Sequence, residues 1–402
     1  MIEIKDKHNC CGCGACVNIC PKECIEMKED QEGFLYPIVD KNLCINCDIC
    51  KKKCPVLNQK KEIEFEQDGY IVQIKDEIIR RESTSGGAFT AIAKYVIRND
   101  GVVFGAAYNN KLEVYHTYVE KDDDLKKFRN SKYVQSIIGN SYKEAKIFLE
   151  KGRIVCFSGT PCQIEGLISY LGKEYYNLIT VDVVCHGVPS PLVWRKYLEL
   201  QHKKYGKDIK NILFRDKHYG YKYSTMTIKD FSDKDVYNMG VESDIMLRAF
   251  FSEICERPIC HECMFKKRYR ISDFTIWDCF SVAEFNKEMD DDKGTTKVLI
   301  HTVNGRKIFE NIKDELRYLK IDPENLTYGV KEMVECSKPN LLRSQFMNDI
   351  NSITSEELFD KYFPDSIKVK IERNIRIITN ELGIYKFSKS IYLKLKSKGR
   401  KI

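Results

Sequence analysis

Apolar residues recur at helical spacing in the stretch RESTSGGAFTAIAKYVIRNDG, and Gly101 at its end is a typical helix stop. Ser85 is the expected N-cap of this helix. Two strand-like runs follow, GVVFGAAY and EVYHTYVE. The apolar positions that share one face of the predicted helix are Phe89, Ile92, Ala93, Val96 and Ile97. The alternation predicts a mixed α/β region in the body of the chain.

Two strand-loop-helix units come next, RIVCFSGTPCQIEGLISYLG and NLITVDVVCHGVPSPLVWRKYL. In the first, Thr160 and Gln163 form a capping box, which places Cys162 in the first helical turn, where the helix dipole favours a thiolate. In the second, Cys185 directly follows the strand. If the two strands are parallel neighbours, both cysteines lie at the carboxyl edge of one sheet, where α/β proteins assemble sites. The alternative for each is a small buried core residue.

Composition narrows the class of protein. The chain has 402 residues, of which 43% are hydrophobic, so it is long enough for two or three domains with a sizeable core. It has no apolar run of transmembrane length and no signal-like stretch, so we predict a cytoplasmic protein without a transmembrane segment. In that reducing compartment 18 cysteines indicate metal or redox cofactors. A net charge of +7 is too mild to indicate nucleic acid, but it suits an acidic partner such as a ferredoxin.

The N-terminal region contains the pattern Cys-x2-Cys-x2-Cys-x3-Cys-Pro twice. In bacterial-type two-cluster ferredoxins the fourth cysteine of each run ligates the other cluster. Zinc knuckles fit poorly, because zinc has no use for this three-plus-one spacing. Cys11 and Cys24 lie outside the pattern and are interpreted as free thiols. We therefore expect two 4Fe-4S clusters, one on Cys10, Cys13, Cys16 and Cys54, the other on Cys44, Cys47, Cys50 and Cys20.

A further pair, Cys260 and Cys263, lies in CERPICHECMFKKRYRISDF. A zinc site lacks a matching second pair of ligands, and a redox dithiol lacks a thioredoxin-like context. An iron-sulfur cluster has two versions. The pair joins either the distant Cys162 and Cys185 around a 4Fe-4S cluster, or Cys255 and Cys279 in a local 2Fe-2S spacing.

Several motifs together resemble one family. SGTPCQIEGL, VVCHGVPSPLVW, RPICHECMFKKRYRISDFTIWD and DDKGTTKVLIHTVNG are similar to the beta subunit of coenzyme F-420 hydrogenase/dehydrogenase, over about residues 1–330. The resemblance implies an iron-sulfur flavoprotein that binds FAD and a further 4Fe-4S cluster, and it favours the version with Cys162, Cys185, Cys260 and Cys263. Relatives act on a deazaflavin coenzyme or on 7-hydroxymethyl chlorophyll, and bacterial fused forms are associated with polysaccharide biosynthesis.

The same resemblance implies site residues. The segments STSGGAFT and NSKYVQS correspond to flavin-contacting segments, and Lys132 would neutralise a phosphate or the charge of a reduced flavin. Plain helix capping by the first segment and a solvated surface lysine are the alternatives. Asp273, Asp278 and Lys132 are the candidate catalytic residues, and a buried hydrogen-bonding role is the alternative for either Asp. WDCFS at 277–281 departs from the family pattern. The candidate flavin-binding residues are Ser85, Gly86, Gly87, Ser131, Lys132 and Tyr133.

The complete prediction is an α+β chain. It has a two-cluster ferredoxin module at residues 1–60, two parts of a mixed α/β catalytic domain at 66–150 and 151–335, and a helical, basic extension at 336–402. The predicted function is an FAD-dependent iron-sulfur oxidoreductase, and the alternative is a non-catalytic electron-transfer subunit. A ferredoxin or a reduced deazaflavin or nicotinamide system would donate electrons to an unidentified organic substrate. No nucleic acid is expected as a partner, and a homo-oligomer is compatible with the sequence.

Overall fold

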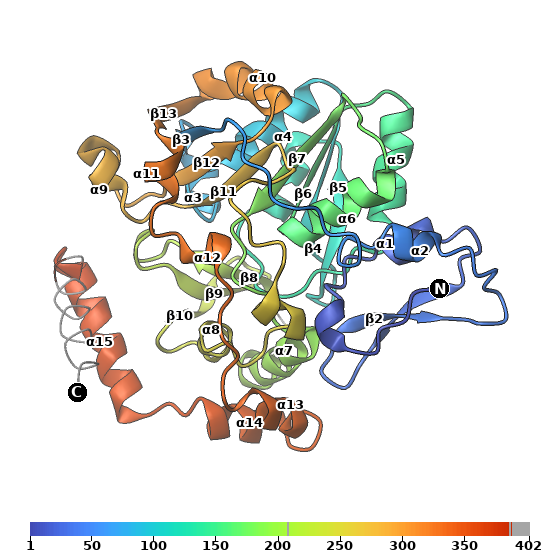
Figure 1. Cartoon of the computed structure of the whole chain (residues 1–402). Helices are drawn as coiled ribbons and strands as arrows, with labels where there is room; N and C mark the ends of the chain where they lie inside the picture. The colour runs from blue at the N-terminus through green and yellow to red at the C-terminus, as the bar shows by residue number, and fades with distance from the viewer. Residues whose placement is uncertain (207–208, 386, 388–402) are drawn as a thin grey trace.

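A computed structural model describes residues 1–206, 209–385 and 387 (Figure 1). Its largest element is an eight-stranded mixed sheet with the strand order β13-β3-β12-β11-β7-β6-β4-β5. Both predicted parts of the catalytic domain contribute strands to this sheet, so they are one structural unit. The strands are β3 (Asp68–Ile74), β4 (Val102–Tyr108), β5 (Val114–Val119), β6 (Val155–Gly159), β7 (Leu178–Val183), β11 (Phe274–Asp278), β12 (Thr296–Ile300) and β13 (Leu316–Ile321).

Helices cover both faces of the large sheet. On one face α4 (Ala88–Arg98) and α10 (Val303–Ile312) pack Ile92 and Ile308 against strand residues such as Val103. On the other face α5 (Ser141–Glu150) and α6 (Pro161–Leu171) pack around the fully buried Phe157 and Tyr142. The short helices are α3 (Glu77–Glu82), α9 (Val282–Phe285), α11 (Pro323–Thr327) and α12 (Lys331–Val334). The result is a three-layer α/β unit.

The four strands β4, β6, β7 and β11 lie side by side in the sheet and run parallel to one another. Their carboxyl ends therefore meet at one edge of the sheet, as predicted for the strands before Cys162 and Cys185. The start of the antiparallel β12 lies at the same edge, because Thr296 pairs with Asp278. This edge, called the carboxyl edge below, is where side chains from distant parts of the chain come together.

A second, smaller sheet lies next to the large one and was not predicted. It contains β8 (Ile209–Asp216), β9 (Thr225–Asp230) and β10 (Asp235–Gly240), all antiparallel. It packs on α7 (Pro191–Tyr205) and α8 (Ile245–Phe251) around Trp194, which is 1% exposed and donates its indole N–H to the Leu112 carbonyl at 2.7 Å. Helix α7 begins at Pro191, with Ser190 as its N-cap.

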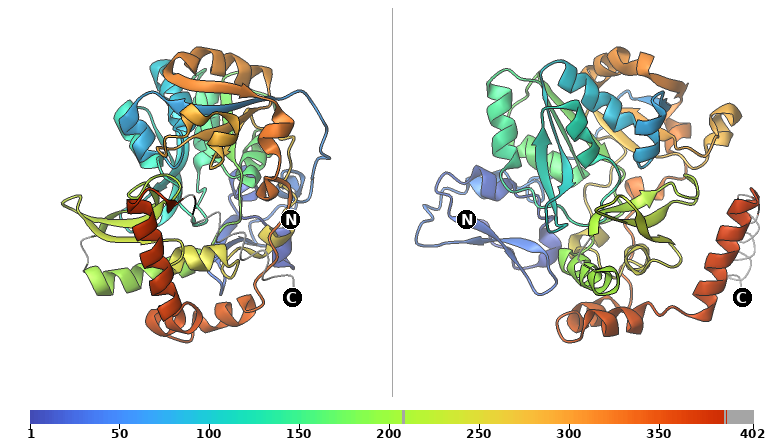
Figure 2. Two further views of the ribbon diagram at one scale, coloured as in Figure 1. Left: turned by 90° about the vertical axis from the view of Figure 1, so that its left-hand side faces the viewer. Right: turned by 180° about the vertical axis from the view of Figure 1, so that it is seen from behind.

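The ferredoxin module forms a hairpin of β1 (Ile25–Glu29) and β2 (Leu35–Val39) with the short helices α1 (Ala15–Ile19) and α2 (Ile49–Lys52). It projects at one side of the molecule in both figures (Figures 1 and 2) and docks on α6. There Ser169 donates a hydrogen bond to the Lys53 carbonyl at 2.9 Å. A Cβ on Gly166 would lie 2.9 Å from the Cβ of Cys13, closer than folded proteins tolerate. Gly166 therefore lets the module approach the helix closely.

The chain after residue 340 is helical, as predicted, with α13 (Arg343–Asp349), α14 (Ser355–Tyr362) and α15 (Ile367–Glu381). Helix α15 lies apart from the ferredoxin module, at the opposite side of the molecule (Figure 2). Most of the predicted basic tail, YKFSKSIYLKLKSKGRKI, falls outside the described residues. None of the helices in the described ranges combines the length and the apolar character needed to cross a membrane.

One predicted helix start is wrong. Helix α4 begins at Ala88 with Gly87 as N-cap, and Ser85 lies two residues before the cap. Gly87 has φ +86°, a left-handed conformation that glycine adopts without a steric penalty. Ser85 instead hydrogen bonds through its hydroxyl to Thr296 at 2.9 Å. The chain therefore uses this serine to attach the loop to β12.

Candidate functional site

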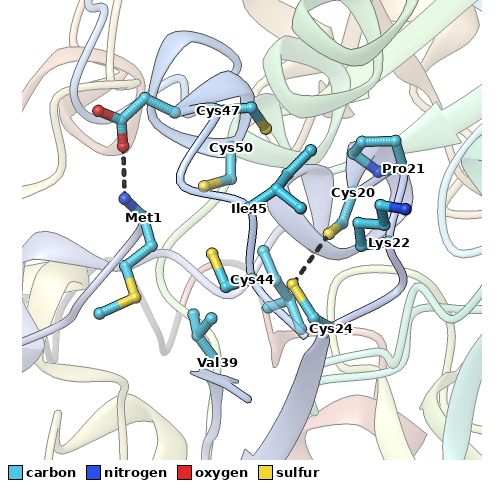
Figure 3. Close-up of a pocket in the computed structure, with 12 residues that line it drawn as sticks. Met1, Cys20, Pro21, Lys22, Cys24, Val39, Cys44, Ile45, Cys47 and Cys50 are labelled. Carbon is cyan, nitrogen blue, oxygen red and sulfur yellow. Dashed lines mark hydrogen bonds and ion pairs between the residues drawn. The ribbon is translucent and has the colours of Figure 1, made fainter. Parts of the chain in front are cut away.

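The ferredoxin module contains two cavities, each surrounded by four of the predicted ligands. Figure 3 shows the one lined by Cys20, Cys44, Cys47 and Cys50. The other is lined by Cys10, Cys13, Cys16 and Cys54. Each cavity, together with the open space at its mouth, spans about 340 Å³. The fold thus brings together the three-plus-one sets expected from the spacing, with the fourth cysteine of each run crossing to the other site.

The two thiols outside the repeated pattern are not remote from these sites. The sulfur of Cys24 lies 3.4 Å from the sulfur of Cys20 and borders the same cavity (Figure 3). Cys11 borders the cavity of Cys10 and, at the same time, a third cavity described next. Both had been interpreted only as free thiols, because spacing alone cannot show which further cysteine is folded against a site.

A third cavity lies at the carboxyl edge of the large sheet. Its lining includes the four distant cysteines predicted to share a cluster, Cys162, Cys185, Cys260 and Cys263. Together with the open space at its mouth it spans about 450 Å³, somewhat more than each cavity of the ferredoxin module. Four thiols around a space of this size fit a 4Fe-4S cluster by ligand type and number.

Three separate pieces of backbone position these thiols. Cys162 follows the confirmed capping box of α6, and Cys185 follows β7. Cys260 lies in the 3-10 turn η3 (Pro258–Glu262), which Cys263 ends. The backbone N–H of Cys263 is held by the Cys336 sulfur at 3.0 Å. Cys336 was missed by the sequence reasoning, because no spacing motif surrounds it.

The alternative ligand sets are not brought together. Cys255 is fully buried in the core around Trp194, and Cys279 is fully buried in a different core with Leu326. Neither borders the third cavity. Among the residues that the structure describes, no three His, Cys, Asp or Glu side chains are grouped closely enough for a single metal ion. The arrangement therefore fits the cluster of Cys162, Cys185, Cys260 and Cys263 better than the local version or a zinc site.

The predicted lowering of the Cys162 pKa is wrong. A hydrogen bond with Cys11, followed by burial, raises the pKa of this thiol well above its ordinary value. Burial likewise raises the pKa of Cys185 and of Cys263 to about 12. The helix dipole is too weak to offset this desolvation. Thiols in such a place lose their protons only to a strongly binding cation such as iron.

The two predicted flavin segments meet at the same carboxyl edge. The hydroxyls of Thr84 and Ser131 lie 3.1 Å apart and join the segments. The backbone N–H of Gly86 donates to the Thr296 hydroxyl at 2.8 Å, and a Cβ on Gly86 would lie 2.3 Å from the Val72 carbonyl oxygen. Gly86 is therefore required for packing of the loop, whatever else it contacts.

Lys132 is not a solvated surface lysine. Its ammonium group donates to the carbonyls of Arg129 and Asn130 at 3.3 and 3.2 Å and lies 5.5 Å from the centre of the Tyr108 ring. Burial lowers the pKa of Lys132 to about 7. Lys217, which donates to three backbone carbonyls including that of Ser85, has a pKa lowered to about 7, with burial as the largest cause. Two amines at this edge are thus poised to gain charge beside an anion.

Asp278 ends β11 at the carboxyl edge and belongs to a polar network. Its carboxylate accepts from the Arg215 guanidinium and from the Tyr221 hydroxyl, both at 3.0 Å. Arg215 also donates to the Tyr133 hydroxyl at 3.0 Å, and its Nη2 is buried with no hydrogen-bond partner. Arg215, Lys217 and Tyr221 lie on or beside β8, in the sheet that the sequence did not reveal. Only tertiary structure shows that they lie near the segments predicted to contact a flavin.

Asp273 lies elsewhere, at the start of β11 and so at the opposite edge from Asp278. Its carboxylate is buried and accepts from the Thr180 backbone N–H at 2.8 Å, from the Thr180 hydroxyl at 2.9 Å and from the Thr302 hydroxyl. These bonds tie β7, β11 and the start of α10 together. The structure therefore gives Asp273 the buried hydrogen-bonding role, remote from Asp278 and the carboxyl edge.

Comparison with known proteins identifies the parts of the chain. Residues 152–325 match the family described as the C terminus of the coenzyme F420 hydrogenase/dehydrogenase beta subunit, and residues 9–58 match a 4Fe-4S dicluster domain. The predicted resemblance to this family and the 4Fe-4S character of the ferredoxin module are confirmed.

Relatives cover different parts of the chain. The coenzyme F420-dependent sulfite reductase of Methanocaldococcus jannaschii is 29% identical over 201 residues, 49% of this chain but only 30% of that enzyme. The F subunit of the F(420)H(2) dehydrogenase of Methanosarcina mazei is 22% identical over 84% of this chain and 92% of its own length. A chain of the solved F420-reducing [NiFe] hydrogenase complex from Methanosarcina barkeri is 16% identical, with a TM-score of 0.44, over 77% of this chain and 94% of that chain.

Proposed function

We propose that this chain is an iron-sulfur flavoprotein oxidoreductase that transfers electrons between a protein donor and an organic or deazaflavin-like substrate. The observation that carries the proposal is the third cavity, where Cys162, Cys185, Cys260 and Cys263 converge from three distant segments beside the ferredoxin module. Bound iron-sulfur clusters supply single-electron transfer, and a bound flavin couples it to two-electron chemistry.

The proposed binding groups for FAD come from loops at the carboxyl edge and from the small sheet. The loops of Ser85 and Ser131 are joined through Thr84, and Lys132 lies immediately after Ser131. The unpartnered Nη2 of Arg215 is a buried donor without an acceptor, a costly state that a bound polar group would relieve. Lys132 and Arg215 are therefore proposed to bind the anionic parts of the flavin or substrate, and Asp278 to orient Arg215.

Electrons are proposed to enter at the outer cavity of the ferredoxin module. Cys47 is exposed there, and Ile45, which lines the cavity, is 58% exposed. Leu43 nearby is 57% exposed. Apolar side chains left open beside a redox centre suit a transient protein partner. The relatives named for F420 make a deazaflavin the first substrate to test.

A non-catalytic electron-transfer subunit is the second candidate. It is favoured by the match over 92% of a protein named as a subunit of a dehydrogenase. The two candidates differ in one measurement. A catalytic chain, photoreduced alone, is reoxidised by an oxidised deazaflavin at a rate that saturates with substrate, whereas a relay subunit is reoxidised only after a partner protein is added.

Cofactor content tests the proposed sites. Anaerobic purification should yield about twelve irons and one FAD per chain, because three 4Fe-4S clusters are expected. Cys162→Ala and Cys260→Ala should each lower the iron to about eight. Cys255→Ala and Cys279→Ala are matched controls, because both thiols are buried outside the cavity, and they should leave about twelve. About eight irons in the unaltered chain would refute the third cluster, and about ten would favour the local 2Fe-2S version.

A second pair of variants tests the flavin site. Lys132→Met should lower the bound FAD, because it removes the amine proposed to bind an anionic part of the cofactor. Lys143→Met is the control, since Lys143 lies outside the two predicted flavin segments and pairs with Glu23, whose side chain is 76% exposed. Equal FAD content in both variants and in the unaltered chain would contradict the proposed place of the flavin.

A further inference from the structure

Arg257 is a buried cation without a carboxylate partner. Its side chain is completely buried. Its guanidinium makes four hydrogen bonds, to two backbone carbonyls, one side-chain amide and one cysteine sulfur. Within the described residues it forms no ion pair with a carboxylate. A buried charge of this kind is strongly unfavourable unless an opposite charge lies nearby. Its surroundings therefore need to supply negative charge.

The hydrogen bonds lead to the ferredoxin module. The guanidinium donates to the Cys10 carbonyl at 2.7 Å, to the Leu35 carbonyl at 3.0 Å and to the Cys10 sulfur at 3.6 Å. Its centre lies 4.1 Å from the centre of the Tyr36 ring. Gln135 accepts at 2.9 Å, and it donates in turn to the Cys11 carbonyl. The cation is thus held rigidly against a ligand of the inner ferredoxin cavity, the one lined by Cys10, Cys13, Cys16 and Cys54.

The backbone of the same residue contacts two residues that line the third cavity, Val188 and Cys260. The Arg257 carbonyl accepts from the Cys260 N–H at 2.9 Å, and the Arg257 N–H donates to the Val188 carbonyl at 3.0 Å. Cys11, which borders both cavities, follows directly after Cys10. Arg257 therefore lies at the junction of the two sites.

The outer ferredoxin cavity, lined by Cys20, Cys44, Cys47 and Cys50, has different charges around it. Lys22 at its rim is exposed. The amino group of Met1 is paired with Asp48, which neutralises it. Charges that are solvent-exposed or already paired exert little field on a nearby site. The buried Arg257 has no equivalent among the residues that line the outer cavity.

We propose that Arg257 is the counter-charge of the inner ferredoxin cluster and holds its reduction potential above that of the outer cluster. The proposal rests on the cluster sites of the proposed function. Reduction adds one electron, and hence one negative charge, to a cluster that already carries four thiolates. A fixed buried cation with a hydrogen bond to a ligand sulfur stabilises that reduced state. Electrons supplied by the protein donor at the outer site are thereby drawn inward, toward the third cavity.

The test is an anaerobic redox titration of the full holoprotein, followed by electron paramagnetic resonance. Arg257→Met should lower the higher of the two ferredoxin-module potentials. At the original midpoint, the ratio of reduced to oxidised cluster should fall at least about tenfold, which is about 59 mV for a one-electron couple. The lower potential should stay unchanged. Arg257→Lys, which keeps the charge, should shift the potential much less than Arg257→Met.

Gln135→Ala is the matched control, because it removes a hydrogen bond to Arg257 and one to Cys11 without changing any charge. It should leave both potentials near their original values. The proposal is overturned if Arg257→Met keeps its iron and shows unchanged potentials, or if Gln135→Ala shifts them equally. If Arg257→Met loses its iron, Arg257→Lys becomes the test. In that case the proposal is overturned if Arg257→Lys lowers the potential by about 59 mV or more, the shift expected when the charge is removed. Low iron in the unaltered chain would instead refute the proposed function.

Discussion

The Arg215–Asp278 pair makes a quantitative prediction about stability. The guanidinium and carboxylate lie 3.0 Å apart, with side chains 10% and 23% exposed. Burial alone would lower the Arg215 pKa, but the Asp278 carboxylate and the Tyr133 hydroxyl raise it, so Arg215 stays charged. At about 4 Å between charge centres and an effective dielectric constant of about 20, the attraction is about 4 kcal/mol. Asp278→Asn leaves Arg215 buried without this attraction.

We expect Asp278→Asn to lower the free energy of unfolding by about 2–4 kcal/mol, somewhat below the usual cost of breaking a fully buried pair because water reaches Asp278. Asp233→Asn is the control. It breaks the pair with Lys210, whose side chains are 66% and 43% exposed, and should cost at most about 1 kcal/mol. The double variant Arg215→Met/Asp278→Asn should lose less than the sum of the single variants, because no unpaired buried charge remains.

The assay is urea-induced unfolding under anaerobic conditions, followed by tryptophan fluorescence. Trp277 adjoins Asp278 in sequence, and Trp194 lies in the core beside the small sheet, so both indoles report on this part of the fold. Equal shifts of the unfolding midpoint in Asp278→Asn and Asp233→Asn would refute the conclusion that the Arg215–Asp278 pair is buried and energetically important.

Three further predictions follow from buried contacts. Burial lowers the pKa of His116 to about 4 and of His301 to about 3. Below about pH 6.5 the unfolded chain therefore binds more protons than the folded chain, and the free energy of unfolding falls as the pH drops. Each imidazole lowers it by up to about 2 kcal/mol at pH 5. Urea midpoints at pH 7 and 5 should therefore differ less in His116→Gln than in the unaltered chain, and an identical difference would be evidence against a buried neutral imidazole. Gly166→Val should destabilise docking of the ferredoxin module by about 1–3 kcal/mol, because even a Cβ at this position would lie 2.9 Å from the Cβ of Cys13. Proteolysis should then release the module faster than from the unaltered chain. Ser169→Ala removes one hydrogen bond to the module and should cost about 1 kcal/mol, clearly less than Gly166→Val, as measured by the same proteolysis.

Local patterns determined much of the fold. The capping box of Thr160 and Gln163 correctly predicted the start of α6, and apolar periodicity predicted α4, because helix caps and faces depend on residues a few positions apart. The start of α4 was misplaced, since only the packing of the loop on β12 shows that Ser85 bonds to Thr296 instead of capping the helix. The small sheet was missed, because its strand pairing is irregular, with register shifts between β8 and β9.

By itself the sequence determined the ligand chemistry. Cysteine spacing predicted the 4Fe-4S module, because thiolate number and spacing define which metal centre can form. The family resemblance favoured the distant set of Cys162, Cys185, Cys260 and Cys263 over the local one. Tertiary structure alone decided which thiols share a cavity, that Asp273 and Asp278 lie at opposite edges of the sheet, and that Arg257 is buried against Cys10. Burial and the approach of charges from distant segments depend on how the elements pack, and a linear pattern does not contain that information.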